Sequence, residues 1–213
     1  MRYILISVVF MVSICAIAQS ELERIDLPTP DVTGGNPLME VLASRQSTRE
    51  FNSEVDLSEQ TISNLLWAGF GVNRHDTGQR TAPSALGANV VDVYLATAEG
   101  LFLFDAEAHC LFKLYSEDIR EFTGNQEFTQ TAPVNLIYVA KYDRIPEQFV
   151  EHQEFYAAAD VGYISQNIYL FCSSEGLATV VLAWIDYQLL AEKINLPENS
   201  QILLTQPVGY PVQ

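Results

Sequence analysis

Residues 80–89 read RTAPSALGAN and lead directly into an apolar segment at residues 90–97. The apolar segment is typical of a buried strand. Small residues and a proline before such a strand let the backbone approach a flat ligand closely, with amide groups available to its heteroatoms. An ordinary connecting loop has the same composition, so this stretch alone is compatible with either role.

Helical and strand patterns alternate along the rest of the chain. Ser58 can cap a helix that ends at Gly69 to Gly71, and apolar positions at helical spacing predict a long core helix over residues 158–174. Further helices are predicted at residues 37–44, 117–122 and 187–194, and further strands at residues 101–104, 110–114, 134–140 and 202–208. Because the first two of these strands form a hairpin, the pattern predicts an α+β fold rather than an all-parallel sheet.

Length, composition and charge limit the class of protein. The chain has 213 residues, of which 48% are hydrophobic, and its formal net charge is −16. This length and composition fit one globular domain with a buried core. The negative charge repels nucleic acid and anionic membranes, so we expect neither as a partner.

The first residues have the pattern of a secretory signal peptide. Arg2 precedes an apolar run at residues 4–14, and residues 16–18 form the small-x-small pattern that a signal peptidase accepts. The run is too short for a membrane span, so none is predicted. We therefore expect residues 1–18 to be a signal peptide and the protein to be exported, to the periplasm.

The remaining chain divides at residue 36. Residues 19–35 contain Pro and Gly without periodicity and are predicted to be an N-terminal arm or linker, followed by one domain at residues 36–213. A lipid anchor at Cys15 is an alternative to simple cleavage, but the bulky Ile14 before that cysteine disfavours it.

Two cysteines remain after the leader, Cys110 and Cys172. In an oxidising compartment they are able to pair, but Cys172 lies in an apolar helical pattern, where a buried free thiol is the more ordinary outcome. The three histidines are scattered and no zinc-like spacing occurs, so no metal site is predicted.

Two further segments have residues suited to binding. In RQSTREF, at residues 45–51, two arginines four positions apart flank a hydroxyl, and forked guanidinium donors with a serine can clamp a phosphate. A polar helix end would account for the same residues. In SSEGL, at residues 173–177, a helix ends on Gly176, for which a simple C-cap is sufficient reason. The order and spacing of Ser, His and Asp suggest no nucleophile–base arrangement, and neither a Walker loop nor a G-x-G-x-x-G fingerprint occurs. These absences argue against common hydrolases and Rossmann proteins.

Taken in order, these segments resemble one family. Residues 44–51 (SRQSTREF), 65–71 (LLWAGFG) and 80–85 (RTAPSA) are similar to motifs of the FMN-dependent nitroreductase superfamily, especially its branch of SagB-type dehydrogenases. Asp160, Gln166-Asn167, Gly176-Leu177 and residues 208–211 also fit. The resemblance extends from about residue 37 to the C terminus.

The resemblance implies an α/β/α sandwich with a mainly antiparallel sheet, which dimerises and holds FMN between the subunits. It implies that the first motif binds the FMN phosphate and ribityl chain, that the Pro-Ser-Ala segment lies along the isoalloxazine of the partner chain, and that backbone after the long helix faces the flavin. Many members of the family carry Asn at the position that Gly87 occupies in this chain. Asn89 is the nearest side-chain amide to that position. The implied cofactor-binding residues are Arg45, Gln46, Ser47, Arg49, Pro83, Ser84, Ala85, Asn89, Glu175, Gly176 and Leu177.

The flavin would carry the chemistry, so no catalytic side chain is predicted. The expected function is that of an exported FMN oxidoreductase that takes hydride from NAD(P)H and passes electrons to a small-molecule acceptor. Two alternatives stay open: a SagB-like dehydrogenase acting on peptides, and a degenerate, flavin-free protein that binds a ligand or partner in the inherited cleft.

Overall fold

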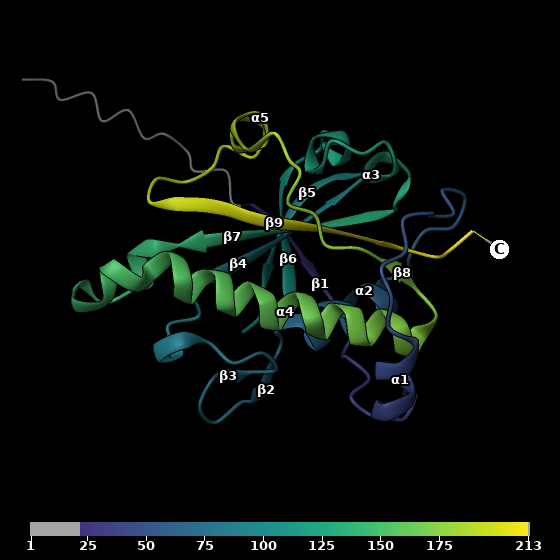
Figure 1. Cartoon of the computed structure of the whole chain (residues 1–213), viewed down its shortest axis with the longest axis horizontal. Coiled ribbons are helices and arrows are strands. Elements are labelled where there is room, and N and C mark those ends of the chain that lie inside the picture. Colours follow the sequence, from purple (N-terminus) through teal and green to yellow (C-terminus); the bar gives the residue numbers. More distant parts are fainter. Residues whose placement is uncertain (1–21, 213) are drawn as a thin grey trace, which may run out of the picture.

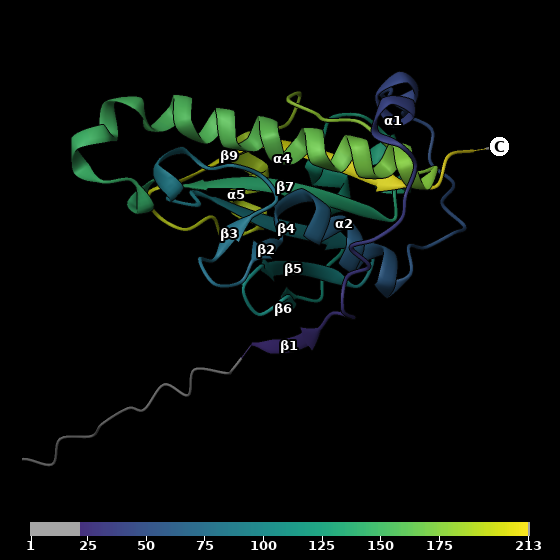
Figure 2. The ribbon, with the colours of Figure 1, turned by 90° about the horizontal axis from the view of Figure 1, so that it is seen from below.

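The computed structural model describes residues 22–212, so the predicted signal peptide and its cleavage site lie outside the described residues. These residues form an α+β fold around a seven-stranded antiparallel sheet with the order β1-β6-β5-β4-β7-β9-β8 (Figures 1 and 2). The sheet strands are β1 (Glu23–Asp26), β4 (Val91–Thr97), β5 (Gly100–Asp105), β6 (Cys110–Tyr115), β7 (Val134–Lys141), β8 (Ala178–Thr179) and β9 (Ser200–Gly209). A separate hairpin joins β2 (Val72–Arg74) to β3 (Gln79–Arg80).

Helices cover both faces of the sheet, which confirms the predicted sandwich. They are α1 (Leu38–Ser44), α2 (Glu59–Phe70), α3 (Phe128–Thr131), α4 (Gln153–Glu175) and α5 (Tyr187–Lys193). Figure 1 shows α4 along one side of the sheet, with α3 and α5 on the other. Two buried apolar clusters correspond to the two faces, one containing residues of α2 and α4 and the other containing residues of α5. Among residues 22–212, no helix combines the length and apolarity needed to cross a bilayer.

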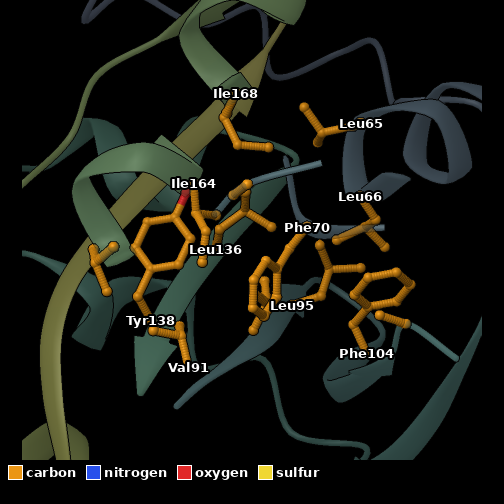
Figure 3. Packing of buried hydrophobic residues seen from close by; sticks show 14 of the residues in the cluster. Leu65, Leu66, Phe70, Val91, Leu95, Phe104, Leu136, Tyr138, Ile164 and Ile168 are labelled. Carbon is orange, nitrogen blue, oxygen red and sulfur yellow. The ribbon is translucent and has the colours of Figure 1, made fainter. Parts of the chain in front are cut away.

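The main core lies between α2, α4 and the centre of the sheet. Figure 3 labels five members of one buried apolar cluster, which are Leu65 and Phe70 of α2, Ile164 of α4, and Leu136 and Tyr138 of β7. All five side chains are buried. The two helices approach closely at Gly69, where a Cβ atom would lie 2.6 Å from Cδ1 of Ile168. The core therefore fixes α4 against α2 and against the sheet.

Most predicted elements are confirmed, with three differences. The long helix begins at Gln153, five residues before its predicted start, and residues 117–122 contain a 3₁₀ turn, Arg120–Thr123, instead of an α-helix. The segment predicted as an arm contains β1, which pairs with β6. Three of the four residues of β1 are exposed, so the strand has no apolar alternation by which its sequence would reveal it.

Both described cysteines are unpaired, and both are buried. Burial raises the pKa of the Cys110 and Cys172 thiols, which reduces the reactive thiolate fraction. A Cys15→Ser variant retains only these two cysteines. In the native variant, we expect a thiol-labelling reagent to modify neither of them. Both should react once denaturant is added. Rapid labelling of the native protein, or no labelling after unfolding without reductant, would contradict this result.

Candidate functional site

The first predicted motif is an extended segment that follows α1. The backbone N–H of Thr48 donates to the carbonyl of Thr179 in β8 at 3.0 Å, and that of Asn52 donates to the carbonyl of Tyr210 at 2.8 Å. Phe51 is buried and forms an isolated bridge with Pro211. The motif is thus held between β8 and the C-terminal residues.

Side chains of this motif surround Tyr169 of α4. The Ser47 hydroxyl lies 2.9 Å from the Tyr169 hydroxyl, and the Arg45 guanidinium lies 5.1 Å from the centre of the Tyr169 ring. The Tyr169 oxygen also accepts a hydrogen bond from the N–H of Val181 at 2.9 Å. Tyr169 therefore orients Arg45 and Ser47, although its sequence context carries no signal of that role.

The two arginines of the motif retain their capacity to bind an anion. Neither Arg45 nor Arg49 forms an ion pair or donates a side-chain hydrogen bond to any residue within 22–212. Arg49 is exposed and Arg45 is partly exposed. Two unpaired guanidinium groups beside a serine hydroxyl provide the donors and the positive charge that a phosphate dianion requires.

The first and third predicted segments meet at a cavity of about 240 Å³. Gln46 lines it together with Gly176 and Leu177, which follow the C terminus of α4. Gly176 has φ +69°, and the N–H of Leu177 donates to the carbonyl of Cys172 at 2.8 Å. This left-handed turn exposes backbone to the cavity, as close contact with a flat ring requires. Glu175 is exposed and does not line the cavity.

The Pro-Ser-Ala segment is fixed by a buried carboxylate. Ser84 donates its hydroxyl proton to Asp160 at 2.6 Å, and the N–H of Ala85 donates to the same carboxylate at 3.0 Å. The Ser84 oxygen in turn accepts from the N–H of Asn89 at 2.9 Å. These groups are therefore engaged within the chain, which leaves Pro83 and the remaining backbone for contact with a ligand.

Asp160 is 1% exposed and lies within the apolar face of α4. Burial raises its pKa, and the hydrogen bonds from Ser84 and Ala85 oppose that shift. The sequence contains the signal for this role, an acidic residue among buried apolar positions, because a charge there requires a partner.

The structure does not bring all three predicted segments together in one chain. Asp160 holds the Pro-Ser-Ala segment, whereas Tyr169 holds the first motif, and the rise of 1.5 Å per residue separates these anchors by about 14 Å along α4. One chain therefore presents two partial sites at different points on the same helix.

Replacing Asp160 with alanine should lower the free energy of unfolding by about 1–3 kcal/mol, because the half-buried donors at Ser84 and Ala85 lose their acceptor. Urea denaturation followed by circular dichroism would measure the change. Glu154→Ala, an exposed position on the same helix, serves as the control and should change stability little. Equal stability of the Asp160→Ala variant and the parent would contradict the anchoring role.

The raised pKa of Asp160 also has a consequence for the dependence of stability on pH. A carboxyl whose pKa is higher in the folded than in the unfolded state binds a proton more readily when folded, so its contribution to stability rises as the pH falls towards its ordinary pKa. We expect the parent to gain stability relative to Asp160→Asn between neutral and mildly acidic pH. A constant difference across that range would show that Asp160 does not titrate as inferred.

Comparison with known proteins identifies the family. A model of the nitroreductase family matches residues 42–210. The chain is 27% identical over 201 residues to a protein of Methanocaldococcus jannaschii whose name places it among the nitroreductases, covering 90% of this chain and 99% of that protein. It is 24% identical over 187 residues to the NADPH-flavin oxidoreductase of Vibrio harveyi, covering 84% and 67% of the two chains.

Solved structures agree with this result. A crystal structure from Ralstonia eutropha, also named as a nitroreductase, has 41% sequence identity and a TM-score of 0.85, covering 91% of this chain and 92% of its own. The structure of the Vibrio harveyi NADPH:FMN oxidoreductase in complex with NAD⁺ has 23% identity and a TM-score of 0.61, covering 84% and 70%. The resemblance to the SagB-type branch stays a prediction. The chain belongs to the nitroreductase family.

Proposed function

We propose that this protein is an FMN-dependent oxidoreductase that accepts hydride from NAD(P)H and reduces a small-molecule acceptor. The observation that carries the proposal is the pair of arginines, Arg45 and Arg49, which have no ion-pair partner within residues 22–212. Neither lines the cavity, but they flank Gln46, which lines it together with Gly176 and Leu177. The names of the Vibrio harveyi relative, which refer to NADPH, flavin and FMN, support the same cofactors here.

The residues fit the parts of FMN. Arg45 and Arg49 would hold the phosphate with Ser47, and Gln46 would bond the ribityl chain. The backbone at Gly176 and Leu177 would lie against the ring. When bound, the flavin supplies reversible hydride and electron transfer, whereas the protein supplies binding, orientation and shielding from water.

A second copy of the chain would complete the site, so we propose a homodimer. Tyr169 holds the first motif and Asp160 holds the Pro-Ser-Ala segment, and these two anchors lie apart along α4. The Pro-Ser-Ala segment of one chain would therefore contact the flavin that the first motif of the other chain binds. Exposed apolar side chains on α1, Leu38 at 61% and Met39 at 75%, are suited to burial in an interface. Multi-angle light scattering should give twice the monomer mass at micromolar concentration, whereas a monomer that retains flavin would contradict this arrangement.

The proposed activity is tested by purifying the mature protein and recording its visible spectrum. Bound oxidised flavin should give a yellow protein, and NADH or NADPH should bleach the flavin bands without oxygen. Steady-state oxidation of the nicotinamide with a quinone or nitroaromatic acceptor then measures turnover. A colourless protein that binds no added FMN would overturn the proposal in favour of a flavin-free binding protein.

Export to the periplasm is the second part of the proposal, and it rests on the sequence of residues 1–18. N-terminal sequencing of protein from the extracellular or periplasmic fraction should begin at Gln19. A product that begins at Met1, or one that is lipidated at Cys15, would contradict cleavage after Ala18.

A further inference from the structure

A second cavity, of about 430 Å³, lies where β4 and β5 diverge. The two strands pair from Tyr94 to Thr97 and from Gly100 to Leu103. Towards Val91 of β4 and Asp105 of β5, the two strands no longer pair with each other. There β4 pairs with β7, and β5 pairs with β6. The opening is lined by Val91 and Val93 of β4 and by Phe104 of β5, together with side chains from the segments on either side.

Arg80 lines this cavity. Its guanidinium lies 4.2 Å from the centre of the buried Phe70 ring. Within residues 22–212 its nitrogens form no side-chain hydrogen bond or ion pair, and its Nε atom is buried. Burial lowers the pKa of Arg80, yet a guanidinium remains charged at physiological pH. The result is a partly desolvated cation with unused donors.

The backbone holds Arg80 in this position from both sides. Arg80 pairs with Val72 in the β2–β3 hairpin, and its carbonyl accepts a hydrogen bond from the guanidinium of Arg74 at 3.0 Å. The N–H of Thr81, the next residue, donates to the carbonyl of Gly71 at 2.9 Å. Arg80 is therefore part of a fixed wall of the cavity.

The other charged groups of the cavity are largely satisfied. Arg144 pairs with Asp92 at 2.7 Å and donates to the carbonyl of Asn89 at 2.8 Å. Asp105 accepts from the N–H groups of Glu107 and Ala108, each at 2.9 Å. Glu107 is exposed and forms no ion pair among the described residues. Arg80 is thus the cation in this cavity whose donors have no acceptor within residues 22–212.

We propose that this cavity binds a small organic monocarboxylate, whose carboxylate pairs with Arg80 while its apolar part packs against Phe104 and Val93. Forked guanidinium donors match a carboxylate in geometry. The neighbouring carboxylates of Asp92, Asp105 and Glu107 favour a single negative charge over the double charge of a phosphate. The site uses none of the residues assigned to FMN except Asn89, which lines its edge.

Isothermal titration calorimetry with benzoate tests this site in the full-length protein. Benzoate should bind saturably, while benzamide, which lacks the charge, and inorganic phosphate should each bind at least about tenfold more weakly. Arg80→Met should weaken benzoate binding at least about tenfold, and Arg80→Lys should weaken it measurably because the fork is lost. Arg24→Met, at an exposed position on β1, is the matched control and should bind as the parent does.

Two further variants distinguish this site from the flavin site and test whether Glu107 competes for Arg80. An Arg45→Ala, Arg49→Ala variant should still bind benzoate, because the proposed FMN residues are not required; loss of binding there would assign benzoate to the flavin site and overturn the proposal. Glu107→Gln should strengthen benzoate binding modestly, because it removes a negative charge that acts on Arg80 in the same cavity. If benzoate binds only after that change, Glu107 itself occupies Arg80 in solution and the proposal is wrong. Absence of binding to the parent would overturn it equally.

Discussion

Changing Arg45 and Arg49 together to alanine is expected to weaken FMN binding by roughly a hundredfold to ten-thousandfold. A charge-assisted hydrogen bond contributes about 1.5–3 kcal/mol, so the loss of either arginine alone should weaken binding roughly tenfold to a hundredfold. Both side chains lack an ion-pair partner within the described residues, so their removal leaves no buried acceptor without a donor. The fold should consequently remain intact, as circular dichroism would show.

Titration of FMN and riboflavin into apo protein, followed by flavin fluorescence, measures the effect. Riboflavin lacks the phosphate and should bind the parent much more weakly than FMN, but should bind the parent and the double variant almost equally. Arg24→Ala removes a surface arginine far along the sheet and controls for the general loss of charge. Equal binding of FMN and riboflavin to the parent would show that the arginines do not recognise the phosphate.

Leu136→Ala is expected to produce the largest loss of stability, about 2–5 kcal/mol, because it leaves a cavity in the core. Leu136 is 0% exposed and lies on β7 between Leu95 of β4 and Gln206 of β9, beneath α4. The surrounding side chains belong to a sheet and a helix that are fixed at many other points, so they have little freedom to fill the space. Urea denaturation followed by circular dichroism would give the change in the free energy of unfolding.

Leu189→Ala is the matched control for this core substitution. Leu189 lies on α5 and is 38% exposed, and alanine favours the helix, so the change should alter stability by about 1 kcal/mol or less. Similar losses for Leu136→Ala and Leu189→Ala would mean that the centre of the sheet is not the stabilising core.

The elements that were predictable from the sequence are those with a local pattern. α2 has a serine N-cap, Ser58, whose side chain accepts from the N–H of Thr61, and its apolar residues recur at helical spacing. The β5–β6 hairpin and β7 are apolar enough to be recognised without tertiary information. By contrast, the bridge of Phe51 with Pro211 joins distant segments, and no local pattern indicates it.

The sequence motifs predicted part of the candidate site, but not the contacts that depend on packing. Ordered motifs placed Gln46, Gly176 and Leu177 in one site, and the structure brings these three to one cavity. The engagement of Ser84 by Asp160 depends on where α4 passes the loop, which only the packing determines. Packing also determines the surroundings of Arg80. Its Nε atom is buried without a hydrogen-bond partner among the described residues, and the sequence around Arg80 does not indicate this.

The extended segment after α1 has a consequence for aggregation. An unprotected edge strand can recruit another chain through its unpaired backbone groups. At one edge of this sheet, β8 has only two residues, and the N–H of Thr48 occupies the carbonyl of Thr179. At the other edge, β1 is four residues long and exposes Glu23, Arg24 and Asp26. The segment that presents Arg45 and Ser47 therefore also shields a sheet edge, so changes that detach it should promote edge-to-edge association between chains.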